Sequence, residues 1–178
     1  MLIKRCEYET SRLKIDCVDS YFSENTEDDK FAQQIISILS DEVTRSLPTG
    51  WHEVRTIERA FSWISERKSE GLVSAILIKP EKETVGFLFL SEETSNKSND
   101  IELRLGYLLT KHVWGQGLGS ELIGGLIKWI KSDGRISLIS GGVDKENIGS
   151  CKVLEKNGFK SSTCELAPNG VVIYERKF

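Results

Sequence analysis

The sequence predicts a mixed α+β or α/β protein whose helices cover a central sheet. Along the chain, the apolar residues change from a helical period to a period of two and back, so helices and strands are interleaved. The 178 residues are 39% hydrophobic and 29% charged, a balance typical of a globular protein with a substantial core. We expect one domain, spanning residues 1–178.

The first predicted elements are a strand and two helices. Arg12–Val18 alternates polar and apolar residues, as a half-buried strand does. Residues 27–46 carry apolar side chains at helical spacings, namely Phe31, Ile35, Ile36, Leu39 and Val43. Pro48 and Gly50 break this pattern, and Thr56–Ile64 resumes it as a second amphipathic helix.

A group of three strands is predicted next. Leu72–Ile78 and Thr84–Leu90 both have a period of two, and a polar turn containing Pro80 joins them. We therefore expect these two strands to form an antiparallel hairpin. Ile101–Leu109 has the same strand pattern and follows a polar stretch.

The strongest predicted helix runs from about Gly117 to Asp133. It has a single apolar stripe, formed by Leu118, Leu122, Leu126 and Ile130. Gly124 and Gly125 lie inside it, although each glycine costs about 1 kcal/mol relative to alanine in a helix interior. We expect a close approach between this helix and the sheet to be the reason for them.

The remaining elements are a strand, a short helix and a hairpin. The strand is predicted over 135–143 and the helix over 147–157, with Gly158 as its C-terminal cap. Residues 159–166 and 171–177 are expected to close the sheet as a hairpin around a Pro-Asn-Gly turn.

Composition and charge exclude several classes of protein. The net charge of −3 argues against a direct nucleic-acid binder, and no apolar run is long enough to span a membrane. Lys4 and Arg5 come too early for a signal peptide. The four cysteines, Cys6, Cys17, Cys151 and Cys164, form no C-x-x-C pair, and there are two histidines. We therefore expect no metal site and a reduced, cytoplasmic location.

The stretch VWGQGLGSELI places three glycines at alternate positions, Gly115, Gly117 and Gly119, between a predicted strand and a helix. A Walker loop would need a lysine that this stretch lacks, and a dinucleotide fingerprint would need glycine at Ser120. Backbone N–H groups at a helix N-terminus bind anions, so a pyrophosphate would fit here. A tight turn that binds no ligand is an equally good interpretation of this stretch alone.

Several motifs together resemble the GNAT superfamily of N-acetyltransferases. Gly117-Leu118-Gly119 resembles the central glycine signature of that superfamily, and Trp114 stands where many members have glutamine or arginine. The block from Asn147 to Phe159 resembles the Asn-x-x-Ser…Gly-Phe segment of the branch typified by ribosomal-protein N-terminal (RimJ/RimL-like) acetyltransferases. Residues 9–13 and 85–87 match the opening and the preceding strand of that branch, so the resemblance covers nearly the whole chain.

This resemblance implies a mostly antiparallel sheet with one splayed parallel strand pair, Ile101–Leu109 and Ile136–Val143, flanked by helices. Acetyl-CoA would lie in the opening between these two strands. Its pantetheine would pair with the backbone of Leu108, Leu109 and Thr110. Its pyrophosphate would contact the backbone of Trp114, Gly115, Gln116, Gly117, Leu118, Gly119 and Ser120. Asn147 and Ser150 would lie beside the pantetheine and the sulfur. The alternative roles are a turn residue for Asn147 and a helix N-cap or first-turn residue for Ser150.

The implied reaction is acetyl transfer from a thioester to a primary amine. Many family members use a tyrosine as acid to the leaving thiolate, but Leu154 occupies that position here, so Ser150 is the candidate proton donor. The family glutamate near the Gly-Tyr pair is replaced by Arg104. Glu102, two residues earlier, is the candidate base acting through water, with a solvated strand-edge carboxylate as its alternative role. Glu165 is a further candidate base.

The acceptor would approach from the face opposite acetyl-CoA. Trp51 and His52 are candidate wall residues, with core packing and surface exposure as their alternative roles. We expect an acetyl-CoA-dependent N-acetyltransferase that is a monomer or homodimer and binds no nucleic acid, membrane or metal. A protein N-terminal α-amine, of ribosomal-protein type, is the leading acceptor, and its pKa of roughly 7.7–8.0 would leave some of it neutral. A small-molecule amine, or a noncatalytic CoA-binding sensor of the same fold, is the alternative.

Overall fold

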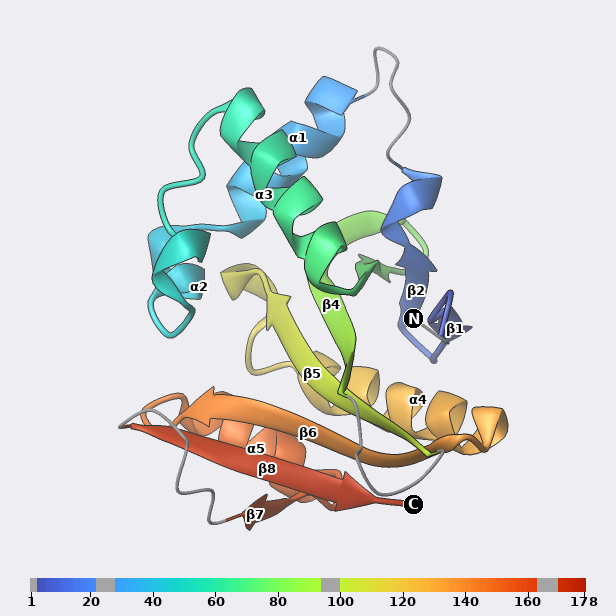
Figure 1. Ribbon diagram of the computed structural model, residues 1–178. Coiled ribbons are helices and arrows are strands. Elements are labelled where there is room, and N and C mark those ends of the chain that lie inside the picture. Colours follow the sequence, from blue (N-terminus) through green and yellow to red (C-terminus); the bar gives the residue numbers. More distant parts are fainter. Residues whose placement is uncertain (1–2, 22–27, 94–99, 163–169) are drawn as a thin grey trace.

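The structure is a computed structural model that describes residues 3–21, 28–93, 100–162 and 170–178 (Figure 1). In this part of the chain, eight strands form one sheet in the order β1-β2-β3-β4-β5-β6-β8-β7. Neighbouring strands are antiparallel except β5 and β6, which are parallel. The expectation of a mostly antiparallel sheet with one parallel pair is therefore confirmed.

The strands are β1 (Tyr8–Glu9), β2 (Leu13–Cys17), β3 (Leu72–Ile78), β4 (Glu83–Glu93), β5 (Ile101–Leu109), β6 (Ile136–Asp144), β7 (Lys160–Ser162) and β8 (Val171–Lys177). The helices are α1 (Asp28–Ile38), α2 (Asp41–Thr44), α3 (Ile57–Glu70), α4 (Leu118–Asp133) and α5 (Ile148–Lys156). Single 3₁₀ turns lie at Val18–Ser20, Thr49–Trp51 and Lys111–Val113. Within the described ranges, no helix is long and apolar enough to cross a membrane.

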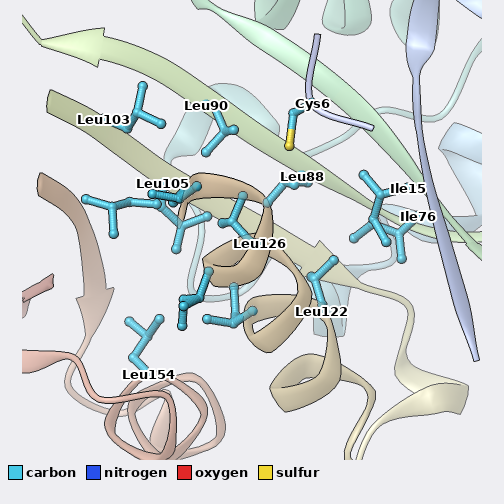
Figure 2. Packing of buried hydrophobic residues seen from close by; sticks show 14 of the residues in the cluster. Cys6, Ile15, Ile76, Leu88, Leu90, Leu103, Leu105, Leu122, Leu126 and Leu154 are labelled. Carbon is cyan, nitrogen blue, oxygen red and sulfur yellow. The ribbon is translucent and has the colours of Figure 1, made fainter. Parts of the chain in front are cut away.

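Helices cover both faces of the sheet, with α1 and α3 on one face and α4 and α5 on the other (Figure 1). On the second face, the apolar stripe of α4 packs against side chains of β2 to β6 and against Leu154 of α5, as Figure 2 shows. On the first face, Trp63 of α3 and Phe87 of β4 belong to a second core. Because both faces are covered, six of the seven residues of β3 are buried.

Two predicted elements differ from the structure. The helix expected over 27–46 is two helices, because Ser40 has extended backbone angles, φ −62° and ψ 159°. The two-residue strand β1 was not predicted, since it is too short to show alternation. In the closing hairpin, residues 163–169, which include Cys164 and most of the expected turn, lie outside the described residues.

The two glycines inside α4 have different surroundings. A Cβ atom on Gly125 would lie 2.5 Å from Cε2 of Tyr8 and 2.8 Å from Cγ2 of Thr10, so close packing against the β1 segment requires glycine there. A Cβ atom on Gly124 would meet only Oδ1 of Asn157, at an ordinary contact distance of 3.4 Å. The expected close approach therefore applies to Gly125.

These neighbouring positions provide a matched test of the packing. We expect Gly125→Ala to lower the free energy of unfolding by about 1–3 kcal/mol through overpacking. Gly124→Ala should instead raise it, by up to about 1 kcal/mol, because alanine favours the helix. Urea denaturation of both variants measures this difference, and equal effects of the same sign would contradict the assignment of Gly125 to the contact.

Candidate functional site

The parallel strands β5 and β6 separate halfway along their length. They pair from Ile101 with Ile136 to Arg104 with Ser140, and beyond this point β5 pairs only with β4, and β6 only with β8 (Figure 1). A Cβ atom on Gly141 would lie 3.2 Å from the carbonyl oxygen of Leu105, so little room exists for a side chain where the strands part. A cavity of about 700 Å³ opens here.

The separation leaves one edge of β5 unpaired. The N–H group of Thr110 donates to the Val85 carbonyl oxygen at 2.8 Å, and hydrogen-bonded residues alternate along an antiparallel pair. The register of β4 and β5 therefore directs the backbone polar groups of Leu108 toward β4, and those of Tyr107 and Leu109 toward the opening. Of the three predicted pantetheine contacts, Leu109 has its N–H group on the side of the opening, whereas Leu108 and the N–H group of Thr110 face β4.

The Trp114 side chain lies at the end of this unpaired edge of β5. Its indole Nε1 donates to the Leu109 carbonyl oxygen at 2.7 Å, while its side chain remains on the surface, with 48% of the residue exposed. The hydrogen bond ties the start of the glycine stretch to the end of β5. A large aromatic surface therefore lies next to the open edge.

The glycine stretch forms a cradle of backbone donors. Gly115 and Gly117 have positive φ angles, of 73° and 78°, and Gly117 is the N-cap of α4. The first intrahelical bond of α4 runs from Glu121 N–H to the Gly117 carbonyl oxygen, so the N–H groups of the first helical turn have no partner within the helix. Leu118, Gly119 and Ser120 supply these donors, which can hold an anion.

An ion pair fixes this cradle to the start of β2. The carboxylate of Glu121 accepts hydrogen bonds from Thr10 Oγ1, from Arg12 N and from Arg12 Nε, each at 2.7 Å. Arg12 also donates from Nη1 to the Gln116 carbonyl oxygen at 3.0 Å. A Cβ atom on Gly117 would lie 3.7 Å from Nη2 of Arg12, so the guanidinium lies directly beside the cradle.

Asn147 and Ser150 meet at the start of α5. The side-chain oxygen of Asn147 accepts from the Ser150 N–H at 3.1 Å, so Asn147 is the N-cap and Ser150 stands one turn inside the helix. Both residues line the cavity. Ser150 is therefore a first-turn residue of α5 rather than its cap, which is one of the alternative roles expected for it.

The expected carboxylate Glu102 lies on the opposite face of β5 from Tyr107. Glu102 lines the cavity, and alternation along the strand places it on the same face as Arg104. Arg104 pairs with Glu93 at 2.9 Å, from Nη2 to Oε1. Glu165 lies outside the described residues.

The two candidate wall residues have different positions. Trp51 lines the cavity, with its ring 4.8 Å from that of Phe89 and 5.0 Å from the guanidinium carbon of Arg67. His52 is not among the residues that line this cavity, and its Nε2 lies 3.0 Å from the Leu47 carbonyl oxygen. The structure therefore brings Trp51, but not His52, to the cavity.

Tyr107 is a site residue that the sequence reasoning did not single out. It lines the cavity between β5 and α5, and its hydroxyl is buried without a hydrogen-bond partner among the described residues. Burial raises the pKa of Tyr107, and the hydroxyl of Ser150 offsets part of this rise. The period of two along β5 places Tyr107 on the face of Leu103 and Leu105, toward α4 and α5, which is the signal that would have indicated its position.

The chain resembles known proteins over nearly its whole length. A family model described as the acetyltransferase (GNAT) domain matches residues 22–160, while the search among curated proteins gave no match. A GNAT-family acetyltransferase structure from Bacillus anthracis is 16% identical, with a TM-score of 0.72 over 97% of this chain and 98% of that one.

Two further structures were solved with bound ligands. RimL, a ribosomal L7/L12 α-N-protein acetyltransferase in complex with coenzyme A, is 19% identical, with a TM-score of 0.72 over 94% of this chain and 95% of its own. The microcin C7 self-immunity acetyltransferase MccE, in complex with acetyl-CoA and AMP, is 17% identical, with a TM-score of 0.72 over 95% and 94%. At these identities the likeness is one of fold.

The pH dependence of stability tests the ion pair beside the cradle. Burial raises the pKa of Glu121, but the hydrogen bonds from Thr10 and Arg12 outweigh burial, so the pKa lies below its ordinary value. A lowered carboxyl pKa stabilises the fold above the unfolded pKa of about 4.3, and this contribution disappears as the pH falls through the folded pKa. We expect Glu121→Gln to cost roughly 1–2 kcal/mol at pH 7 and progressively less below about pH 4.3.

Urea denaturation between pH 7 and pH 3 measures this effect. Asp41→Asn is a matched control, because its partner Arg55 and Asp41 itself are both exposed, and such pairs contribute about 0.5 kcal/mol or less. A destabilisation by Glu121→Gln that stayed constant over this pH range would show that the charge of Glu121 is not what holds the cradle.

Proposed function

The chain belongs to the acetyltransferase (GNAT) domain family, whose members transfer an acetyl group from acetyl-CoA, and we propose that it is an N-acetyltransferase acting on a primary amine. The leading acceptor is a protein N-terminal α-amine. The observation that carries this proposal is the separation of β5 from β6. It places an unpaired strand edge beside a cavity, and the anion cradle at the start of α4 follows the same strand along the chain.

The start of α4, the edge of β5 and the cavity offer groups that suit successive parts of acetyl-CoA. The first-turn N–H groups of α4 and the nearby Arg12 suit the pyrophosphate, because both are positive. The N–H group of Leu109 at the strand edge suits an amide carbonyl of pantetheine. The cavity beside Ser150 and Asn147 then receives the acetyl thioester, which supplies the acyl group.

Two side chains are assigned to proton transfer. Ser150 lines the cavity from α5 and gives a proton to the departing sulfur. Glu102 lines it from the other face of β5 and accepts the proton of the amine through water. With an α-amine, part of the acceptor is already neutral near pH 7, so Glu102 has only a modest task.

The charges around the acceptor side favour a cationic amine. The cavity is lined by Glu70, Glu93, Glu102 and Glu175, against two arginines, Arg67 and Arg104. Arg67 pairs with Glu70, and Arg104 with Glu93, so neither arginine is free to attract a substrate carboxylate. The aromatic ring of Trp51 provides an apolar wall for the group next to the amine.

The similarity in fold to RimL, a ribosomal L7/L12 α-N-protein acetyltransferase, supports a protein N-terminus as acceptor. The free thiols of Cys6, Cys17 and Cys151 support a cytoplasmic location. A small-molecule amine is the alternative acceptor.

Turnover with a panel of amines tests the proposed function. Purified protein would be incubated with acetyl-CoA and either peptides of different N-terminal residues or small amines, including polyamines, amino acids and aminoglycosides. Released thiol and the mass of the product would be measured. We expect release with peptides, with the acetyl group on the α-amine. Tight CoA binding without turnover on any amine would contradict the proposal and indicate a noncatalytic CoA-binding protein.

A charge introduced into the cradle tests the pyrophosphate assignment. Gly117→Glu and Gly117→Gln impose the same backbone strain, since position 117 has a φ of 78°, but differ in charge. We expect the glutamate variant to bind CoA at least about tenfold more weakly than the glutamine variant, since one tenfold step corresponds to about 1.4 kcal/mol. Calorimetric titration with CoA measures the affinities, and thermal unfolding checks that both variants fold. Equal affinities would remove the pyrophosphate from this cradle.

A further inference from the structure

The face of the sheet that carries Glu102 has a hollow where β5 and β6 part. Arg104 of β5 and Ser140 of β6 form the last residue pair between these strands. The next residues on the same face are Gly106 of β5 and Gly142 of β6, which have no side chain. All four residues line the cavity. The fold therefore leaves space just beyond the last pair, on the face from which we expect the acceptor.

The packing of the sheet does not require the glycine at position 106. A Cβ atom there would lie 3.7 Å from Cβ and Cδ2 of Phe89, which is an ordinary contact distance. Gly106 is also not among the described glycines with a positive φ angle, so its backbone suits other residues. The hollow is therefore not a by-product of close packing.

Ser140 provides a polar side chain at the edge of this hollow. Its neighbour Ile139 belongs to the core under α4, so alternation directs the Ser140 side chain to the opposite face, into the cavity. Ser140 is 7% exposed, and its hydroxyl forms no hydrogen bond with any residue that the structure describes. The buried hydroxyl of Ser74, by contrast, donates to the Cys6 carbonyl oxygen at 3.0 Å. A molecule in the cavity can supply the partner that the fold does not give to Ser140.

The charged groups on either side of Ser140 suit a cationic amine. On β5, Arg104 is held in its ion pair with Glu93. On β8, Glu175 stands directly opposite Ser140 and lines the cavity, and it forms no ion pair with a described residue. Lys160, the neighbour of Glu175 on β7, does not line this cavity. A negative charge therefore lies next to the hydroxyl without a matching cation in the cavity wall.

We propose that Ser140 binds the nitrogen of the acceptor amine, with its Oγ accepting a hydrogen bond from one amine N–H group. This inference rests on the proposed function. A hydroxyl oxygen can accept from the amine in both its neutral and its cationic form. An N–H group held by Ser140 directs the lone pair of the neutral nitrogen away from Ser140. The lone pair can then face the acetyl carbon in the opening, as attack on the thioester requires.

Ser140 keeps its own proton during the transfer. The amine nitrogen bonds to the acetyl carbon, the carbon–sulfur bond breaks, and the sulfur keeps the electron pair and takes a proton from Ser150. The nitrogen loses one proton through water to Glu102 and retains the proton that it donates to Ser140. Exchange with solvent then returns a proton to Ser150 and removes one from Glu102.

Removal of the hydroxyl tests this assignment, with the amine that the unmodified protein acetylates best in the panel. At saturating acetyl-CoA, Ser140→Ala should lower kcat/KM for the amine roughly tenfold, as expected for one lost hydrogen bond. The KM for acetyl-CoA should stay within about twofold. The melting temperature should not fall, because the free protein loses no hydrogen bond. Ser74→Ala is the matched control: it removes a hydroxyl that is bonded within the fold, so it should lower the melting temperature and leave kcat/KM unchanged.

Two further comparisons separate the hydroxyl from the shape of the site. Threonine and valine have nearly the same shape, but only threonine has a hydroxyl, so Ser140→Thr should exceed Ser140→Val in kcat/KM by roughly tenfold. Gly106→Ala adds a methyl group to the hollow, where the packing allows one, so it should lower kcat/KM for the amine without lowering the melting temperature.

Four results would each overturn the inference. These are an unchanged kcat/KM in Ser140→Ala or in Gly106→Ala, equal values for the threonine and valine variants, a loss in Ser140→Ala that weaker acetyl-CoA binding explains, and a fall in its melting temperature as large as that of Ser74→Ala. In all of them the unmodified protein still acetylates an amine. If the unmodified protein shows no turnover with any amine, the proposed function fails, and this inference fails with it.

Discussion

The site depends on a constraint of backbone hydrogen bonding at the point where β5 and β6 part. Pairing ends at Arg104 and Ser140, and a strand edge buried in protein without a partner would be strongly unfavourable. The cavity provides the solution, because Leu105 and Tyr107 line it, so the backbone polar groups on this edge face open space rather than apolar side chains. An edge of this kind can pair with a ligand that has amide groups, as one strand pairs with another. The same separation that weakens the sheet therefore creates the binding surface.

The anion cradle is also linked to the N-terminal part of the chain. The cradle at Gly117 follows β5, yet its position is fixed by Arg12 at the start of β2, through Glu121 of α4. The carboxylate lies in the first turn of α4, where the helix dipole favours a negative charge, and it accepts hydrogen bonds from Thr10 and Arg12. Arg12 remains beside the cradle and adds positive charge there. One ion pair thus orders the loop without occupying its donors.

The sequence pattern predicts this fold well where the period is strong and turn residues flank it. The bounds expected for 101–109 and 171–177 agree with β5 and β8, and the glycine stretch was correctly placed at the start of α4. The break at Ser40 was missed, because its extended backbone carries no proline or glycine signal. His52 shows the larger limitation. Whether its side chain reaches the cavity depends on the turn that holds it against the Leu47 carbonyl oxygen, and no local period contains that turn.

At both positions that depart from the family motifs, the side chain has partners of its own in this structure. Leu154 fills the core where a tyrosine is expected, and Arg104 engages Glu93 where a glutamate is expected. The opening itself comes from the backbone, where the pairing of β5 with β6 ends at Arg104 and Ser140, so it does not require a tyrosine or a glutamate at these two positions. Tyr107 lines the cavity from β5, and its buried hydroxyl has no hydrogen-bond partner in the described part of the chain.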